Sequence, residues 1–307
     1  MLSRTILGEH YSEVITIRTG AFPVVGIVGL THGDEIVGRK VLNRLQSELP
    51  PLLQEGQVKL IYANLPAEAA ETPFIDANLN RIFPGKREGK LEQKIAYHLR
   101  DTLADCHFVI DIHSTMLEQG TFAVTTVDPT KFEVTDATRK LYEESGLSPE
   151  TRRPFEADIL YGLVRDTGLA RHVQMNHTVA NGGSLIEFVN AYSQGYGLSF
   201  EAGQHQDPAS EEVAMKVVFN FLQARRMIPG EPYRQEQEVF LGQEFIPKPS
   251  DTFFPSPELR NFEMLPAGKS YGRDETQEYS LNRDCYVLLH APRMRDGKVF
   301  LRADKIS

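Results

Sequence analysis

Two short segments of this 307-residue chain carry side chains of the kinds that bind a catalytic metal ion. His32 and Glu35 stand three residues apart, so a tight turn or one helical turn brings the imidazole and the carboxylate to the same side. His113 lies in a second segment, at the end of another apolar stretch. Two histidines and one glutamate, with a fourth position left for water, form a known catalytic zinc set. The sequence therefore predicts a zinc site at His32, Glu35 and His113.

The elements around these residues are those of an α/β protein. Apolar runs at residues 23–30 and 108–110 precede the two segments and are typical of buried strands. Binding sites in open α/β sheets gather at the carboxyl ends of strands, where both segments would lie. Further strands are expected at residues 14–17, 58–63, 185–189 and 198–201, and helices at 35–49, 90–103 and 208–226. This alternation predicts a sheet covered by helices.

The pattern of apolar and turn-forming residues changes after Pro229 and Gly230. Short apolar pieces then stand between Pro and Gly turns, and no long helical pattern remains. We therefore expect a catalytic α/β domain over residues 1–229 and a small β-rich C-terminal domain over residues 230–307.

Three more residues have types that suit catalysis beside a metal. Asn80 and Arg81 offer an amide and a guanidinium fork, which suit recognition of a carboxylate. Glu201 ends an apolar strand and could take a proton from water and hand it to a leaving amine. Glu187 competes with Glu201 for this role on pattern alone. Asp111 shares a strand face with His113, where it either orients that ligand or makes a buried structural hydrogen bond.

Composition limits the classes of partner. The net charge of −9, from 42 acidic and 33 basic residues, argues against a general nucleic-acid or anionic-membrane surface. No run of about 18 apolar residues is present, so no transmembrane helix is expected. Cys106 and Cys285 form no CxxC pattern, which favours free thiols in a reducing cytosol. We expect a cytoplasmic protein with no nucleic-acid or membrane partner, and a homo-oligomer is compatible with the sequence.

Four segments in order, residues 31–35, 78–85, 111–115 and 200–203, resemble the aspartoacylase/succinylglutamate desuccinylase family, relatives of the zinc carboxypeptidases. The resemblance implies a zinc-carboxypeptidase-like mixed sheet flanked by helices, with a small C-terminal β domain. It also implies that His32, Glu35 and His113 bind one Zn²⁺ per subunit.

The same resemblance implies roles for the other residues. Asn80 and Arg81 would hold a substrate carboxylate, and Arg81 would add positive charge near the reacting group. Glu201 would be the general base, in preference to Glu187. The implied activity is a zinc-dependent amidohydrolase that removes an acyl group from a small N-acylated amino acid or amine.

The sequence departs from the family pattern just before Asn80. Asn78 stands where the family usually has Asp, and residues 71–76 contain no Arg where the family usually carries one. The acyl group and the amine of the substrate are therefore left open. Two alternatives stay open as well: a metallocarboxypeptidase that cleaves short peptides, and a non-catalytic metal-binding homologue.

Overall fold

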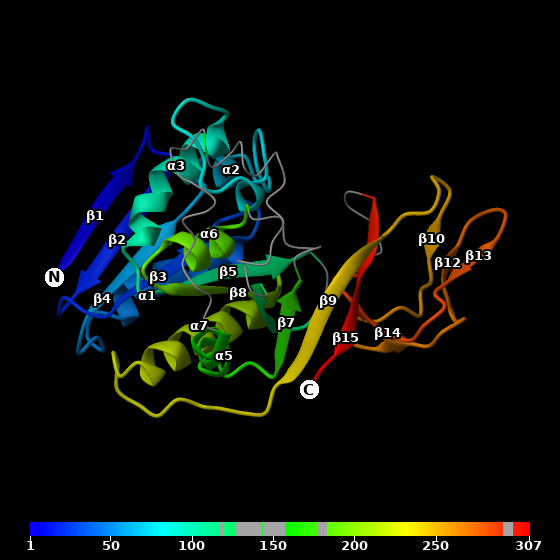
Figure 1. Ribbon diagram of the computed structural model, residues 1–307. Helices are drawn as coiled ribbons and strands as arrows, with labels where there is room; N and C mark the ends of the chain where they lie inside the picture. The colour runs from blue at the N-terminus through cyan, green and yellow to red at the C-terminus, as the bar shows by residue number, and fades with distance from the viewer. Residues whose placement is uncertain (117–118, 127–142, 144–156, 177–182, 291–296) are drawn as a thin grey trace.

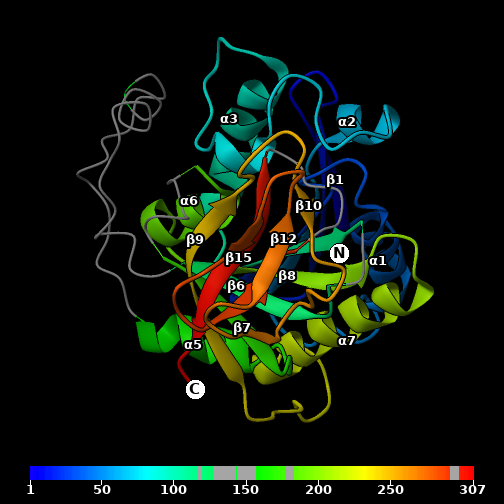
Figure 2. The same ribbon diagram turned by 90° about the vertical axis from the view of Figure 1, so that its right-hand side faces the viewer.

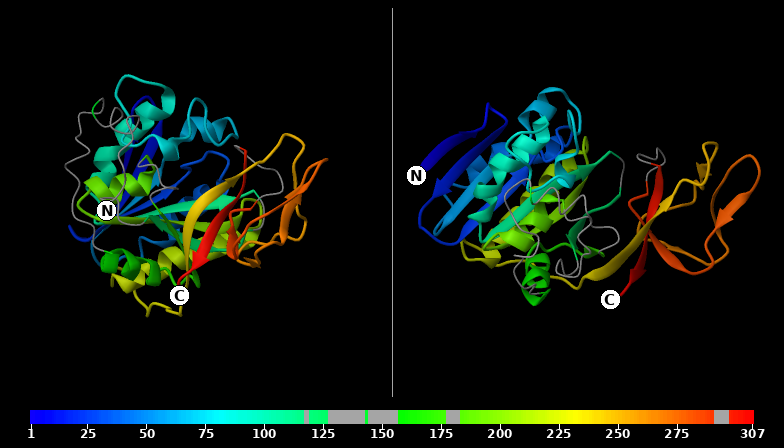
Figure 3. Two further views of the ribbon diagram at one scale, coloured as in Figure 1. Left: turned by 45° about the vertical axis from the view of Figure 1, so that its right-hand side comes forward. Right: turned by 45° about the horizontal axis from the view of Figure 1, so that its top comes forward.

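The structure is a computed structural model that describes residues 1–116, 119–126, 143, 157–176, 183–290 and 297–307. Within these residues its centre is a mixed sheet of twelve strands in the order β1-β2-β4-β3-β5-β8-β6-β7-β9-β15-β14-β11 (Figure 1). The fold is thus of the α/β class, as the alternation of patterns predicts. Figure 3 shows the N-terminal strand β1 and the C-terminal strands at opposite ends of the molecule.

Four neighbouring parallel strands form the core of the sheet: β4 (Gln57–Tyr62), β3 (Val24–Gly29), β5 (Phe108–Thr115) and β8 (Tyr196–Gln204). Every residue of β3 is buried, because a strand covered on both faces needs apolar side chains on both sides. Two antiparallel strands complete this side of the sheet, β2 (Ser12–Arg18) beside β4 and β1 (Leu2–Leu7) at the edge.

Helices cover both faces of the parallel core. One face packs against α1 (Ile36–Glu48), α5 (Ala157–Arg165) and α7 (Pro208–Ala224). The other packs against α3 (Leu91–Ala104) and α6 (Leu185–Tyr192). Successive residues of one strand alternate between the two layers, as Ile27 and Val28 do in β3. Two short helices, α2 (Leu65–Ala69) and the 3₁₀ helix η1 (Leu79–Arg81), stand in the segment between β4 and α3.

The second half of the sheet follows β8. Its strands are β6 (Phe122–Thr126), β7 (Arg171–Met175), β9 (Glu238–Pro247), β15 (Lys298–Lys305), β14 (Cys285–Leu288) and β11 (Met264–Leu265). A separate three-stranded sheet holds β10 (Phe254–Pro255), β12 (Ser270–Arg273) and β13 (Glu278–Ser280). Figure 2 views the molecule from the side of these C-terminal strands.

Most of the elements expected from sequence are confirmed, with shifts of a few residues at their ends. The expected strand at residues 185–189 is wrong, because this segment forms helix α6. The Ser184 side chain accepts a hydrogen bond from the Glu187 N–H, and the Glu187 carboxylate accepts one from the Ser184 N–H. This reciprocal capping satisfies two backbone donors and starts a helix where the apolar run alone suggested a strand.

The C-terminal residues are rich in strands, yet the main sheet runs into them without interruption. Strand β9 pairs in parallel with β7, and a shared apolar cluster joins Val173 to Phe240 and Leu301. A further cluster, around Phe253 and Phe300, lies within the C-terminal part. The division into domains at residues 229 and 230 stays a prediction. Among the described residues, no helix has the length and apolar character needed to cross a membrane.

Candidate metal centre

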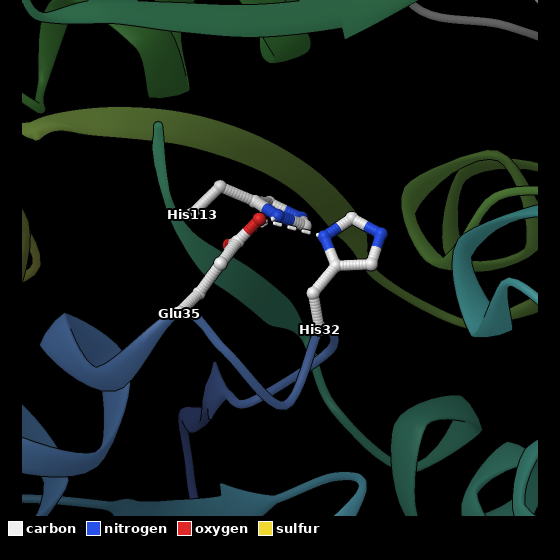
Figure 4. Close-up of side chains that lie close together, drawn as sticks. All are labelled: His32, Glu35 and His113. Carbon is white, nitrogen blue, oxygen red and sulfur yellow. Dashed lines mark hydrogen bonds and ion pairs between the residues drawn. The ribbon is translucent and has the colours of Figure 1, made fainter. Parts of the chain in front are cut away.

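The three side chains predicted to bind a metal meet at the carboxyl ends of β3 and β5. His32 follows β3, Glu35 immediately precedes α1, and His113 lies on β5. One ligand-type atom from each of them lies within 4.8 Å of the other two. The Glu35 carboxylate stands between the two rings, with Oε1 2.7 Å from His32 Nδ1 and Oε2 2.9 Å from His113 Nδ1 (Figure 4). The structure brings the set together, and its role in metal binding stays a prediction.

A tight turn carries His32 and Glu35 to this place. Leu30 adopts a positive φ of 63° after β3, and the Glu35 N–H donates to the His32 carbonyl oxygen at 3.2 Å. Between them, Gly33 packs against helix α2. A Cβ atom on Gly33 would lie 2.2 Å from the carbonyl carbon of Ala67, which no side chain tolerates. The turn therefore requires glycine between the two candidate ligands.

Each ring is held from behind by a second polar group. His113 Nε2 lies 2.8 Å from Asp111 Oδ2, and the Thr31 hydroxyl donates to Asp111 Oδ1 at 2.7 Å. His32 Nε2 lies 3.2 Å from Asn78 Oδ1. Acceptors at both Nε2 atoms direct both Nδ1 atoms toward Glu35, as ligand histidines are oriented in metal sites. Asp111 thus both orients the His113 ring and takes part in a buried hydrogen bond.

The charges of the cluster balance one another. Burial lowers the pKa of His113, but the Asp111 and Glu35 carboxylates outweigh burial and raise it well above its ordinary value. Burial favours the neutral form of Glu35, yet His113 and His32 hold the pKa of this carboxyl well below its usual range. The cluster thus favours a carboxylate next to positive charge, which protons or a metal ion can supply.

The donor set fits zinc by its chemistry. Two imidazole nitrogens and one carboxylate oxygen converge, and both imidazoles are backed by acceptors on their outer sides. Catalytic zinc sites use three such protein ligands and leave a fourth position for water or substrate. His32, Glu35 and His113 are therefore the residues that would hold the ion.

Glu201 stands beside this cluster. It lies on β8 in register with His113 on β5, so the two residues are neighbours across paired strands. Burial raises the pKa of Glu201 to about 7. Its Oε2 is buried and has no hydrogen-bond partner among the described residues. A carboxyl group in this environment can exchange a proton near neutral pH, as a general base must.

A pocket opens over the cluster, and His32, His113, Glu201, Asn80 and Arg81 line it. The Asn80 Oδ1 atom accepts a hydrogen bond from the Leu185 N–H at 2.9 Å, which leaves the Asn80 Nδ2 group as the donor suited to a substrate. The exposed Arg81 donates through Nη1 to the Asn80 carbonyl oxygen at 2.6 Å. The structure thus brings both predicted carboxylate-binding residues to the pocket beside the candidate metal ligands.

Sequence reasoning missed most of the apolar wall of the pocket. This wall is formed by Val124, Met175, Ile186, Phe245 and Leu289. Phe245 and Leu289 come from the C-terminal strand-rich part, and no local pattern links them to the metal segments. Glu187, the rival base on pattern, also lines the pocket, but from helix α6. Ser184 followed three residues later by Glu187 is a capping-box pattern, and this pattern could have predicted the start of that helix.

Comparisons with known proteins find relatives over part of the chain. Residues 21–147 match the family described as the succinylglutamate desuccinylase/aspartoacylase catalytic domain. The chain is 35% identical over 112 residues to the N-alpha-acetyl-L-2,4-diaminobutyric acid deacetylase of Halomonas elongata, covering 35% of this chain and 33% of that protein. It is 31% identical over 108 residues to a probable aspartoacylase of Parasynechococcus marenigrum, covering 32% and 36%. The aligned part spans about a third of each of these relatives.

Solved structures share the fold over nearly the whole chain. A succinylglutamate desuccinylase/aspartoacylase from Rhodobacter sphaeroides superposes with a TM-score of 0.74 at 18% identity, over 100% of this chain and 94% of that one. The product-bound ectoine utilisation protein EutE from Ruegeria pomeroyi gives 0.74 at 19% identity, over 96% and 88%. The C-terminal strands therefore belong to an architecture that these proteins share.

Proposed function

We propose that this chain, whose residues 21–147 match the succinylglutamate desuccinylase/aspartoacylase catalytic domain, is a zinc-dependent amidohydrolase that removes an acyl group from a small N-acyl amino acid or amine. The observation that carries the proposal is that the candidate metal ligands lie next to the candidate general base. The His32, Glu35 and His113 cluster opens into the pocket in which Glu201 is the strand neighbour of His113. One Zn²⁺ per subunit would be held by that cluster.

The chemistry that zinc supplies when bound is Lewis acidity, which makes water nucleophilic near neutral pH and polarises a carbonyl group. Glu201 accepts the proton of the attacking water at its carboxylate and passes it to the departing amine nitrogen. A pKa raised by burial to about 7 suits both halves of this transfer. Water adds to the acyl carbon, the C–N bond breaks, and the products are a carboxylic acid and a free amine.

Two residues of the pocket wall position the substrate in this proposal. The Arg81 guanidinium and the Asn80 Nδ2 group would hold a substrate carboxylate, and Arg81 would also favour negative charge that develops on the acyl oxygen. Residues 71–76 contain no arginine, so an arginine from that segment has no part in the mechanism. The names of the two curated relatives, a deacetylase of an acetylated diamino acid and a probable aspartoacylase, support an N-acyl amino acid as the substrate.

The setting of the enzyme is part of the proposal. Cys106 and Cys285 are buried free thiols, which agrees with a reducing, cytoplasmic location. The partner is a small N-acylated molecule, with no role for nucleic acid or membrane. Phe245 and Leu289 add an apolar wall to the pocket, which suits the hydrocarbon part of an acyl group.

The test is primary-amine release by zinc-loaded protein over N-acetyl, N-succinyl and N-formyl amino acids, with short peptides in parallel. We expect one acyl class to be hydrolysed. Glu201→Gln should lower the rate by at least about 100-fold and keep one zinc per chain, because it removes the base and keeps the ligands. Cleavage of peptides alone would make the protein a carboxypeptidase, and loss of zinc from Glu201→Gln would make Glu201 a ligand.

His113→Ala gives an independent check of the metal set. Removing one of three protein ligands should sharply lower zinc affinity, as measured by competition with a chromophoric chelator. An unchanged zinc affinity would take His113 out of the coordination sphere.

A further inference from the structure

A second carboxyl group in the pocket has no part in the proposed hydrolysis. Glu187 is 3% exposed and lines the pocket together with His113 and Glu201. Its Oε2 accepts a hydrogen bond from the Ser184 N–H at 2.8 Å. Its Oε1 is buried and has no hydrogen-bond partner in the part of the chain that the structure describes. Burying a carboxylate oxygen without a hydrogen-bond donor destabilises the protein, so a ligand that donates a hydrogen bond to this atom would bind favourably.

The local structure holds the Glu187 carboxyl group in place. It is the third residue of α6, where the positive end of the helix dipole favours a carboxylate. The Glu187 N–H donates to Ser184 Oγ at 3.2 Å, which closes the capping box and fixes the direction of the side chain. Among the described residues, no lysine or arginine forms an ion pair with Glu187.

Glu187 is held in a fixed relation to the residues proposed to bind the substrate carboxylate. The Leu185 N–H at the start of α6 donates to Asn80 Oδ1 at 2.9 Å, and the Phe83 N–H donates to the Gly183 carbonyl oxygen at 2.9 Å. These two bonds join η1 to the start of α6. One side of the pocket therefore presents a guanidinium, from Arg81, and a carboxylate, from Glu187.

We propose that Glu187 Oε1 binds an ammonium group of the substrate, and that the substrate is a diamino acid acylated on one nitrogen. The inference rests on the proposed function, because the acylated nitrogen is the one released by hydrolysis. An N-acyl amino acid with a single amine has no ammonium group left to meet Glu187. A diamino acid keeps one, on the side chain if the α-nitrogen is acylated and at the α-position if the side-chain nitrogen is.

The first experiment measures binding, which does not require turnover. Calorimetry on the zinc-loaded Glu201→Gln protein, which lacks the base, compares 2,4-diaminobutyrate acetylated at the α- or at the γ-nitrogen with N-acetyl-2-aminobutyrate, which has no ammonium group. We expect one of the two diamino compounds to bind at least about tenfold more tightly than N-acetyl-2-aminobutyrate, because a charge-assisted hydrogen bond of this kind is worth at least that ratio. Equal affinities would overturn the assignment of Glu187.

Three variants test whether Glu187 causes the preference. Glu187→Gln should remove it while the helix stays capped, because glutamine also completes a capping box. Glu187→Asp keeps the charge and should retain more of the preference than Glu187→Gln. Glu211→Gln is the matched control, since Glu211 lies in the first turn of α7 outside the pocket and pairs with Arg44. A preference that survives Glu187→Gln would refute the proposal.

Turnover separates this proposal from the one on which it rests. Acetyl-diaminobutyrate acylated at the α- or at the γ-nitrogen is compared with N-acetyl-2-aminobutyrate. Faster hydrolysis of one diamino compound supports both proposals and identifies the acylated nitrogen. Diamine-selective binding without any amine release would refute the hydrolase proposal and would support Glu187 as a binding site for an ammonium group. Equal hydrolysis of substrates with and without a second amine would support the hydrolase proposal and would exclude Glu187 from substrate recognition.

Discussion

Glu201 and Glu187 line one pocket, and Glu35 contacts two histidines of its lining, so that three carboxyl groups have three different environments. The neighbouring histidines hold the pKa of Glu35 well below its usual range despite its burial. Burial raises the pKa of Glu201 to about 7. Glu187 is fixed by a capping box at a helix start. Carboxyl groups whose environments differ in this way can serve as an anion, a proton acceptor and a recognition group at one site.

A substitution of Asp111 should lower the affinity for zinc and leave the fold intact. Asp111→Asn keeps the size of the side chain but places either an N–H₂ group or a neutral oxygen against His113 Nε2. We expect zinc affinity to fall by about 10- to 100-fold, as for other acceptors behind a ligand histidine. Chelator competition measures the affinity, and circular dichroism checks the fold. Thr31→Val is the control that removes the hydroxyl donor to Asp111 and should cost less. Unchanged affinity in Asp111→Asn would contradict the orienting role.

At the scale of elements, helix α3 holds the segment that carries Asn78. Glu92, near the start of α3, is fully buried, and its carboxylate accepts the backbone N–H groups of residues 75, 76 and 77 at 2.6, 3.0 and 3.1 Å. The next residue, Asn78, contacts His32 Nε2. A buried carboxylate on one helix thus sets the position of a group that orients a candidate ligand.

Glu92→Ala should therefore affect both stability and the metal. It leaves three backbone donors without their acceptor, so we expect a loss on the order of 3 kcal/mol in the free energy of unfolding. Zinc affinity should fall as well, because Asn78 is no longer held against His32. Urea unfolding and chelator competition measure the two effects, with the exposed Glu88→Ala as control. Normal zinc affinity in a destabilised Glu92→Ala protein would show that Asn78 is positioned by other contacts.

His172 on β7 joins three elements and should make stability depend on pH. It is 2% exposed, contacts the Thr125 hydroxyl on β6 at 2.7 Å and packs against the Tyr161 ring of α5. Burial lowers the pKa of His172 from 6.5 to about 4. Between these values the unfolded chain binds a proton that the folded protein does not, so stability is lost as the pH falls from 6.5 to 4.

The full loss from this group is on the order of 3 kcal/mol. Urea unfolding at a series of pH values measures it, with His172→Gln as the comparison, since glutamine does not titrate. The gap between the two pH curves should change by this amount over the stated range. Parallel curves would mean that His172 titrates alike in the folded and unfolded states.

The parallel strands, and the position of the candidate ligands at their ends, could be predicted because local sequence specifies them. A fully apolar run such as that of β3 has few alternatives, and the polar residues that follow must lie at the strand end. Residues 185–189 were misassigned because a short apolar run fits a buried strand or a buried helix equally well. The pocket wall from Phe245 and Leu289 could not be predicted, because it depends on which distant segment packs over the site.

At the scale of the whole molecule, one sheet connects the candidate metal ligands to the C-terminal strands. Residues 1–229 produced alone would lose β9, which pairs with β7, and the cluster that joins Val173 to Phe240. We expect this shortened chain to associate or unfold, because the edge of β7 and its apolar face would be exposed. Gel filtration with light scattering and thermal unfolding would show it. A monomeric, cooperatively unfolding 1–229 would instead establish the N-terminal part as an independent domain.

The order of the elements along the chain also has a consequence for biosynthesis. The turn after β3, which holds His32 and Glu35, and strand β5, which holds His113, leave the ribosome before β8, the strand of Glu201. Phe245 and Leu289 follow later still. Domains fold as units during synthesis, and one sheet joins these strands to the C-terminal ones, so the three candidate ligands are made early but would be brought together only when the later strands have followed. Metal loading would then await the completed chain.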